Sequence, residues 1–116
     1  YVSETKEQAY SESRESALFS KERLSNRVAE YAHHSDGTKG WEEQAERIQA
    51  MDYDDWLRDK VAYGTPGAVL DRLGGLKEEL GLDKVMFEVN FGSLIPHERQ
   101  LKSLKLFTEQ VMPQLR

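Results

Sequence analysis

The chain contains no cysteine, so disulfide bonds and thiol chemistry are excluded. It also lacks an apolar run of membrane-spanning length and a signal-peptide pattern. No basic cluster interrupts its acidic balance, and a net charge of -5 argues against a surface that binds nucleic-acid phosphates. These absences predict a cytoplasmic protein whose partners include neither a membrane nor a nucleic acid.

What is present is a polar chain of 116 residues, enough for one domain, with 38% hydrophobic and 32% charged residues. Three stretches combine helical periodicity with a helix-starting signal: residues 5–32, residues 66–80 and the residues from Pro96 onward. Gly81 predicts the end of the second helix, and Pro113 predicts a late kink or stop in the third. The pair of glycines at 74–75 predicts close packing against that second helix.

Short β-branched or aromatic stretches predict strands at residues 1–3, 61–64 and 84–91. In the last of these, Val85, Phe87 and Val89 share one face and are expected to pack on Leu104 and Phe107. Alternating strands and helices predict a parallel sheet covered by helices. Three strands cannot close a barrel or protect both edges, so we expect a homo-oligomer or the remainder of a barrel to cover them.

The connection between the first helix and residue 61 is long. Residues 33–40 form its strongest break, and residues 41–59 are acidic with scattered large apolar side chains that predict one or two short helices. A connection of this length is typical of a functional lid or a disordered segment, so residues 35–60 are interpreted as a lid-like insertion.

The first residue is Tyr1, and "YVSET" reads as the end of a strand with nothing before it. We therefore expect the chain to be the C-terminal piece of a longer protein.

Several motifs, in order, resemble the C-terminal third of the bacterial-luciferase-like flavin monooxygenases. They are Gly64-Thr65-Pro66 at a helix start, "SLKLF" at 103–107, and Val111-Met112-Pro113 in the closing helix. "YVSET" and "SDGTKGW" are similar to the family's sixth strand and to the mobile insertion before its seventh. Gly67 departs from the family, which usually has Glu after the proline.

The resemblance implies an α/β fold, a helix-rich fragment with strands six to eight of a (β/α)8 TIM barrel. It implies an oxidoreductase in which FMN, reduced by a separate flavin reductase, reacts with O2 to oxygenate a small-molecule substrate. The alternative is a non-catalytic flavin-binding relative or an oligomerising remnant.

Functional groups of such a barrel lie at the carboxyl ends of its strands. This places the candidate cofactor-binding residues at Tyr63 and Gly64 and at Asn90, Phe91 and Gly92. The alternative is that Asn90 caps a turn and Phe91 belongs to the core. No catalytic residue and no metal ligand is assigned.

Three further residues, Lys39, Gly40 and Trp41, are candidates for the root of a lid. Glycine would supply a hinge and Trp41 an apolar latch that excludes water. The alternative is a disordered loop with one incidental tryptophan.

Overall fold

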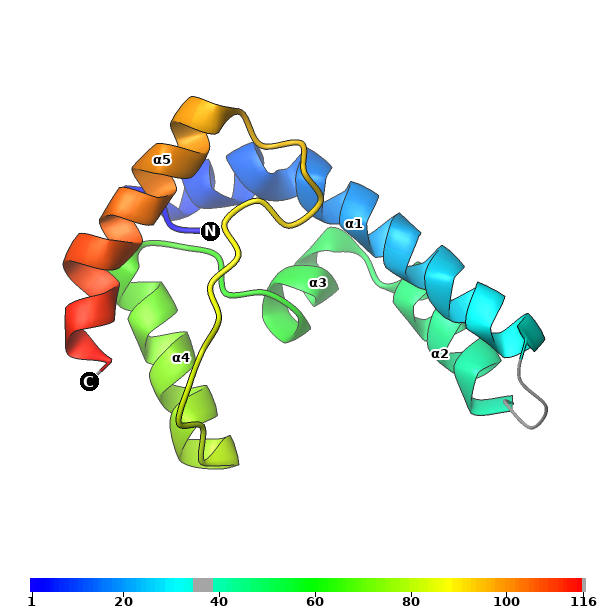
Figure 1. The fold of residues 1–116 in the computed structure, drawn as a ribbon. Helices are drawn as coiled ribbons and strands as arrows, with labels where there is room; N and C mark the ends of the chain where they lie inside the picture. Colours follow the sequence, from blue (N-terminus) through cyan, green and yellow to red (C-terminus); the bar gives the residue numbers. More distant parts are fainter. Residues whose placement is uncertain (35–38, 116) are drawn as a thin grey trace.

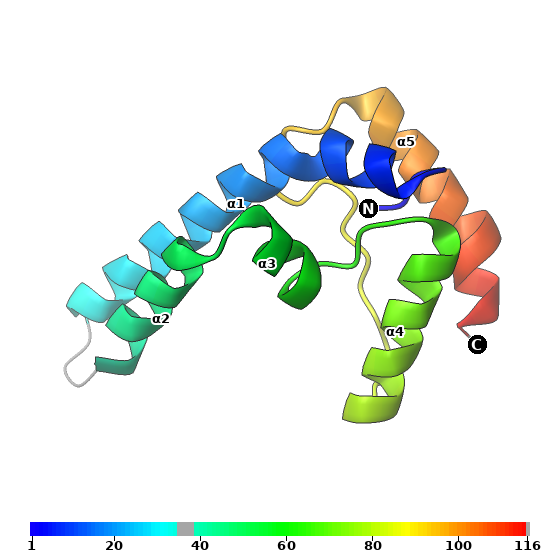
Figure 2. The same cartoon turned by 180° about the vertical axis from the view of Figure 1, so that it is seen from behind.

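The computed structural model of the chain describes residues 1–34 and 39–115, which form five α-helices (Figure 1). Helix α2 folds back along α1, whereas α4 and α5 form a second arm on the other side of the N-terminus (Figures 1 and 2). The helices are α1 (Lys6–His34), α2 (Lys39–Ala50), α3 (Tyr53–Asp59), α4 (Pro66–Leu80) and α5 (His97–Leu106).

The N-terminal segment pairs in parallel with residues 62–64. The Tyr1 amino group donates to Ala62 O (3.1 Å), Gly64 N donates to Tyr1 O (3.1 Å), and Ser3 N donates to Gly64 O (3.0 Å). Val2 and Gly64 form the corresponding parallel bridge. Bonds that alternate in this way are the hydrogen-bond pattern of neighbouring parallel strands. The first two predicted strands are therefore neighbours, although they pair through a single bridge.

The outer edge of this short pairing is covered by α5. The buried Val2 N–H donates to Ser103 Oγ over 2.7 Å, and Lys102 Nζ lies 3.3 Å from a Glu4 carboxylate oxygen. The expectation that both sheet edges are bare is wrong at this edge. A buried backbone N–H requires an acceptor. At this edge the Ser103 hydroxyl accepts from Val2 N–H, where a neighbouring strand would otherwise offer a carbonyl oxygen.

Residues 84–91 run extended between the two arms, and in the described part of the chain they form no ladder with another strand. Phe87 nevertheless stacks on Phe107, with ring centroids 3.9 Å apart. This confirms the predicted packing of Phe87 on Phe107. Met86, on the other face, is 96% exposed. Val85 and Leu104 are also exposed, so the predicted packing on Leu104 is wrong.

Helix α1 packs through a face of small residues. Its buried positions are mainly alanines and serines: Ala9, Ser13, Ser16, Ala17, Ser20 and Ser25. Buried hydroxyls are satisfied by neighbouring segments, since Ser25 Oγ donates to Ala45 O of α2 over 3.1 Å. The small side chains let α2 and α3 approach α1 closely, and the largest core cluster forms there around Trp56 and Ile48.

The helix ends follow the sequence signals. Thr65 Oγ1 accepts from Ala68 N at the start of α4, and Gly81 ends α4 with a left-handed φ of 63°. The closing helix changes to a π-helical turn at Phe107–Val111 and a 3-10 turn at Met112–Gln114, because Pro113 lacks the N–H that an α-helix would use. The predicted close packing at Gly74 and Gly75 is wrong, since a Cβ at either position would meet nothing within 4 Å.

Substitution Ser103→Ala tests the capped edge. It leaves the buried Val2 N–H without an acceptor and is expected to lower the free energy of unfolding by about 1–3 kcal/mol. The control is Ser11→Ala, which removes an exposed hydroxyl on α1 and is expected to change stability by less than about 0.5 kcal/mol. Urea denaturation followed by circular dichroism gives both values. Equal stability of the two variants would contradict the role of Ser103.

Candidate functional site

The turn that follows the extended segment is held by its own side chains. Asn90 O accepts from Ser93 N, and Asn90 Oδ1 accepts from Ile95 N, each over 2.9 Å. Asn90 therefore caps the turn, which was the alternative to a cofactor-binding role for this residue. Its side-chain NH2 group donates to none of the described residues, so two donors stay available for a ligand.

The same turn is fastened to α1 through Ser16. The Ser16 hydroxyl donates to Phe91 O (2.8 Å) and accepts from Leu94 N (3.2 Å). Gly92 adopts a φ of 103°, and a Cβ at this position would overlap Ser16 O. Glycine is required here for its positive φ and for this close approach of two backbones.

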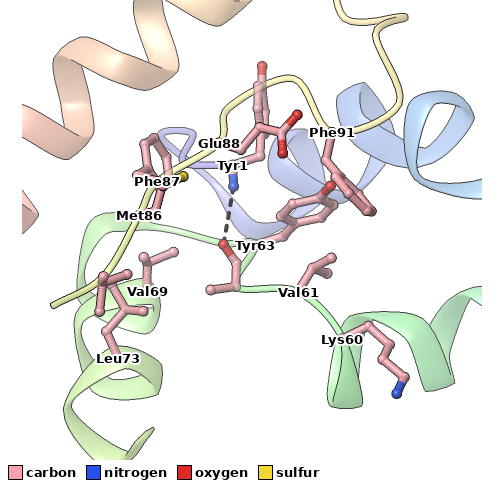
Figure 3. Close-up of a pocket in the computed structure, with 12 residues that line it drawn as sticks. Tyr1, Lys60, Val61, Tyr63, Val69, Leu73, Met86, Phe87, Glu88 and Phe91 are labelled. Carbon is pink, nitrogen blue, oxygen red and sulfur yellow. Dashed lines mark hydrogen bonds between the residues drawn. The ribbon is translucent and has the colours of Figure 1, made fainter. Parts of the chain in front are cut away.

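A hollow of about 230 Å³ lies between residues 60–63 and residues 85–88 (Figure 3). Its walls are largely apolar and come from three segments, with Val61 below, Val69 and Leu73 of α4 on one side, and Phe87 above. Tyr63, Glu88 and Phe91 border its other end. The hollow occupies the place where the second and third predicted strands would pair.

Tyr63, which borders the hollow, carries a buried polar atom. Its hydroxyl is buried and has no hydrogen-bond partner in the described part of the chain. Burial raises the pKa of the Tyr63 phenol well above its usual range, and the negative charges that Tyr53 and Glu88 can carry act in the same direction. The Tyr63 phenol therefore stays neutral, and its O–H donor is not used within the described residues.

Tyr53 is the contrasting case. Its hydroxyl donates to Tyr10 O over 2.7 Å and lies 3.2 Å from Ser13 Oγ. Burial also raises the pKa of Tyr53, and its contact with the Ser13 hydroxyl acts in the opposite direction. The Tyr53 hydroxyl is thus used to join α3 to α1, whereas that of Tyr63 is not used structurally.

A second hollow of about 250 Å³ lies on the other side of the turn. Arg23 and Arg27 of α1 face Gly92 and Ser93 across it, and Glu88 borders it as well. Two guanidinium groups favour an anion, but the Glu88 carboxylate offsets part of their charge.

Neither hollow encloses a flavin mononucleotide. Sites for ligands of cofactor size usually measure roughly 300–1,000 Å³, and both hollows are smaller. The acceptor atom of Asn90 is used within the turn, and Glu88 opposes a phosphate beside the two arginines. As the described residues form them, these two hollows do not fit FMN.

The structure brings some of the predicted site residues together and separates others. Tyr63 and Phe91 border the first hollow, while Phe91 and Gly92 border the second. Gly64 lies apart, because its backbone is occupied by the pairing with Tyr1 and Ser3.

The predicted lid residues stand elsewhere. Lys39, Gly40 and Trp41 form the first turn of α2, and neither Gly40 nor Trp41 lines either hollow. The predicted insertion contains two helices as expected, α2 and α3, and both are anchored to α1 by buried side chains such as Ile48 and Trp56. Residues 35–38 fall outside the described residues.

Sequence reasoning did not select Glu88, Arg23 or Arg27 as site residues. Glu88 and Lys84 are the two charged residues on the face that they share with Asn90, which was a usable signal. The spacing of four residues puts Arg23 and Arg27 on one face of a helix, but it does not reveal that the 90–95 turn lies against that face.

A scan against protein-family models, a search of curated proteins and a search of solved structures each return no match. Among residues 1–34 and 39–115, no three His, Asp or Glu side chains gather in a way that would hold a metal ion. In the same ranges, no helix combines the length and apolarity needed to cross a membrane.

Substitution Gly92→Ala is expected to destabilise the chain by about 1–3 kcal/mol or more, because alanine is strained at this φ and its Cβ would overlap α1. The matched control is Gly75→Ala, at an exposed helix position with open space, which is expected to stabilise by about 1 kcal/mol. Thermal and urea denaturation measure both changes. A Gly92→Ala variant as stable as the unsubstituted chain would refute the close approach of Gly92 to Ser16.

The two buried tyrosines give a second matched pair. Tyr53→Phe removes a satisfied hydroxyl and is expected to cost about 1 kcal/mol, whereas Tyr63→Phe removes an unsatisfied one and is expected to be neutral or stabilising. Chemical denaturation of both variants gives the comparison. A loss for Tyr63→Phe as large as that for Tyr53→Phe would mean that the Tyr63 hydroxyl has a structural partner.

Proposed function

We propose that this chain is the C-terminal βα portion of a luciferase-like, FMN-dependent monooxygenase. The observation that carries the proposal is the parallel pairing of residues 1–3 with residues 62–64 across an intervening helical connection. Residue 64 then leads directly into the Thr65-Pro66 start of α4. A strand, a helical crossover and a parallel neighbour are the repeating unit of a (β/α)8 barrel.

In this proposal the chain supplies one wall of a shared site. The ends of its paired segments and the Asn90–Gly92 turn would belong to the mouth of the barrel, where such enzymes bind their ligands. The parent protein would use reduced FMN from a separate reductase, together with O2, to oxygenate a small organic molecule in the cytoplasm. The chain alone is proposed to be inactive, since its own residues do not enclose the cofactor.

Several exposed apolar side chains support the proposal that another part of the parent protein, or another copy of the chain, covers this surface. Leu101 and Leu104 lie exposed on α5, and Met86 is almost fully exposed on the extended segment. The radius of gyration is 15.7 Å, against about 13 Å for a compact domain of this length. These features fit a chain completed by the remainder of a barrel or by further copies of itself.

The second candidate function is a non-catalytic, oligomerising unit. The observation in its favour is the Val2–Ser103 hydrogen bond, because α5 there occupies the edge at which a barrel would place another strand. A remnant that assembles through its exposed apolar faces would need no flavin.

The experiment combines gene sequence, oligomeric state and flavin binding. The coding sequence before Tyr1 is expected to contain five more βα units, and the parent protein is expected to bind FMN and consume O2 with a reductase present. The isolated chain is expected to bind FMN no tighter than millimolar and to sediment as an oligomer. Micromolar FMN binding by the chain alone would contradict the shared site. A gene that begins near Tyr1 would favour the oligomerising unit.

A further inference from the structure

We propose that the second hollow, between α1 and the turn at Gly92 and Ser93, binds a small zwitterion of the acidic amino-acid class. The carboxylates of the ligand would pair with Arg23 and Arg27, and its ammonium group would pair with Glu88. This site goes beyond the flavin chemistry proposed above, because its charged groups all belong to this chain and require no flavin.

Three charged side chains line this hollow without pairing across it. Arg23, Arg27 and Glu88 all border the same volume of about 250 Å³. Among residues 1–34 and 39–115, neither guanidinium forms an ion pair with a carboxylate, and Glu88 forms none with a basic side chain. A ligand that carries charges of both signs can therefore satisfy both sides of the hollow.

The α1 side of the hollow is suited to carboxylates. Arg23 and Arg27 are four residues apart on α1, which places them on one face of the helix. The guanidinium carbon of Arg23 lies 5.7 Å from the ring centroid of Phe19. A guanidinium that stacks on an aromatic ring keeps its N–H edge free, and this edge matches a carboxylate in a bidentate contact.

Neutral hydrogen-bond donors add to the two arginines. Ser20 and Ser93 line the hollow, and neither hydroxyl forms a hydrogen bond within the described part of the chain. The Gly92 N–H donates to none of the described residues either. The turn is fixed to α1 by the two hydrogen bonds of Ser16, so it is in place before a ligand binds. A site that is already ordered loses less conformational freedom on binding.

The balance of charge and the volume set the class of ligand. With two guanidinium groups and one carboxylate, an inorganic anion is repelled by Glu88 and a simple cation is repelled by both arginines. An acidic amino acid carries two carboxylates and one ammonium group, which is the complement of this set. The hollow is smaller than the roughly 300–1,000 Å³ of sites for ligands of cofactor size, so a nucleotide is excluded.

The test compares L-glutamate with glutarate, which has the same two carboxylates but no ammonium group. Titration of the isotope-labelled chain at neutral pH, followed by backbone amide NMR, is expected to shift the signals of Gly92 and Ser93 with glutamate. Glutamate is expected to bind at least about threefold more tightly than glutarate, as an exposed ion pair to Glu88 provides. In Glu88→Gln this preference is expected to vanish.

Substitution Arg27→Gln is expected to weaken glutamate binding about tenfold, because it removes a charge-assisted contact to a ligand carboxylate. The matched control is Arg72→Gln, which removes an exposed guanidinium on α4 that lines neither hollow and is expected to leave binding unchanged. Circular dichroism verifies that each variant is folded.

Absence of shifts at Gly92 and Ser93 at millimolar glutamate would overturn the proposal. Glutarate or inorganic phosphate that binds the unsubstituted chain as tightly as glutamate would also overturn it, since a simple anion site would then suffice. The titration contains no flavin, so its outcome is independent of the monooxygenase assay.

Discussion

The arrangement of the whole chain depends on three backbone hydrogen bonds between residues 1–3 and residues 62–64. Successive residues of an extended segment point to opposite faces, so Tyr1 and Val2 enter different clusters. Val2 packs with Val69 and Phe107, which fixes α4 and the closing helix on one side. Tyr1 packs with Ala9 and Ile95, which fixes α1 and the start of α5 on the other. A pairing of very few residues therefore sets the positions of both arms.

Local features of the fold were predictable from the sequence because their causes are local. Thr65, Pro66 and Gly81 define α4 through capping and backbone geometry alone, and Pro113 disrupts the closing helix by its missing N–H. The first helix extends through its serine-rich half, against its low intrinsic propensity. There, Ser13 and Ser16 find acceptors in Ala9 O and Phe91 O, and tertiary packing outweighs the preference of the isolated segment.

The features that sequence reasoning missed depend on contacts between distant segments. The pattern of residues 84–91 indicates an extended conformation and distinguishes the faces of Met86 and Phe87, but it does not specify a hydrogen-bonding neighbour. Likewise, Asn90 is recognisable as a polar residue at a strand end, whereas its bond to Ile95 N depends on the path of the turn. Of the candidate site, Tyr63, Phe91 and Gly92 were found in advance. Glu88 and the two arginines of α1 became visible only once the turn lay against that helix.

The hollow and the missing strand pairing have one physical origin. Neighbouring strands in a ladder lie about 4.8 Å apart, which leaves no space between them for a ligand. Here Phe87 is drawn toward Phe107 and Val89 toward Tyr1 and Ile95, so residues 84–91 stand away from residues 61–63. That displacement leaves a hollow of about 230 Å³ between the two segments. The apolar contacts of Phe87 and Val89 thus hold residues 84–91 out of a ladder with residues 61–63 in the described chain.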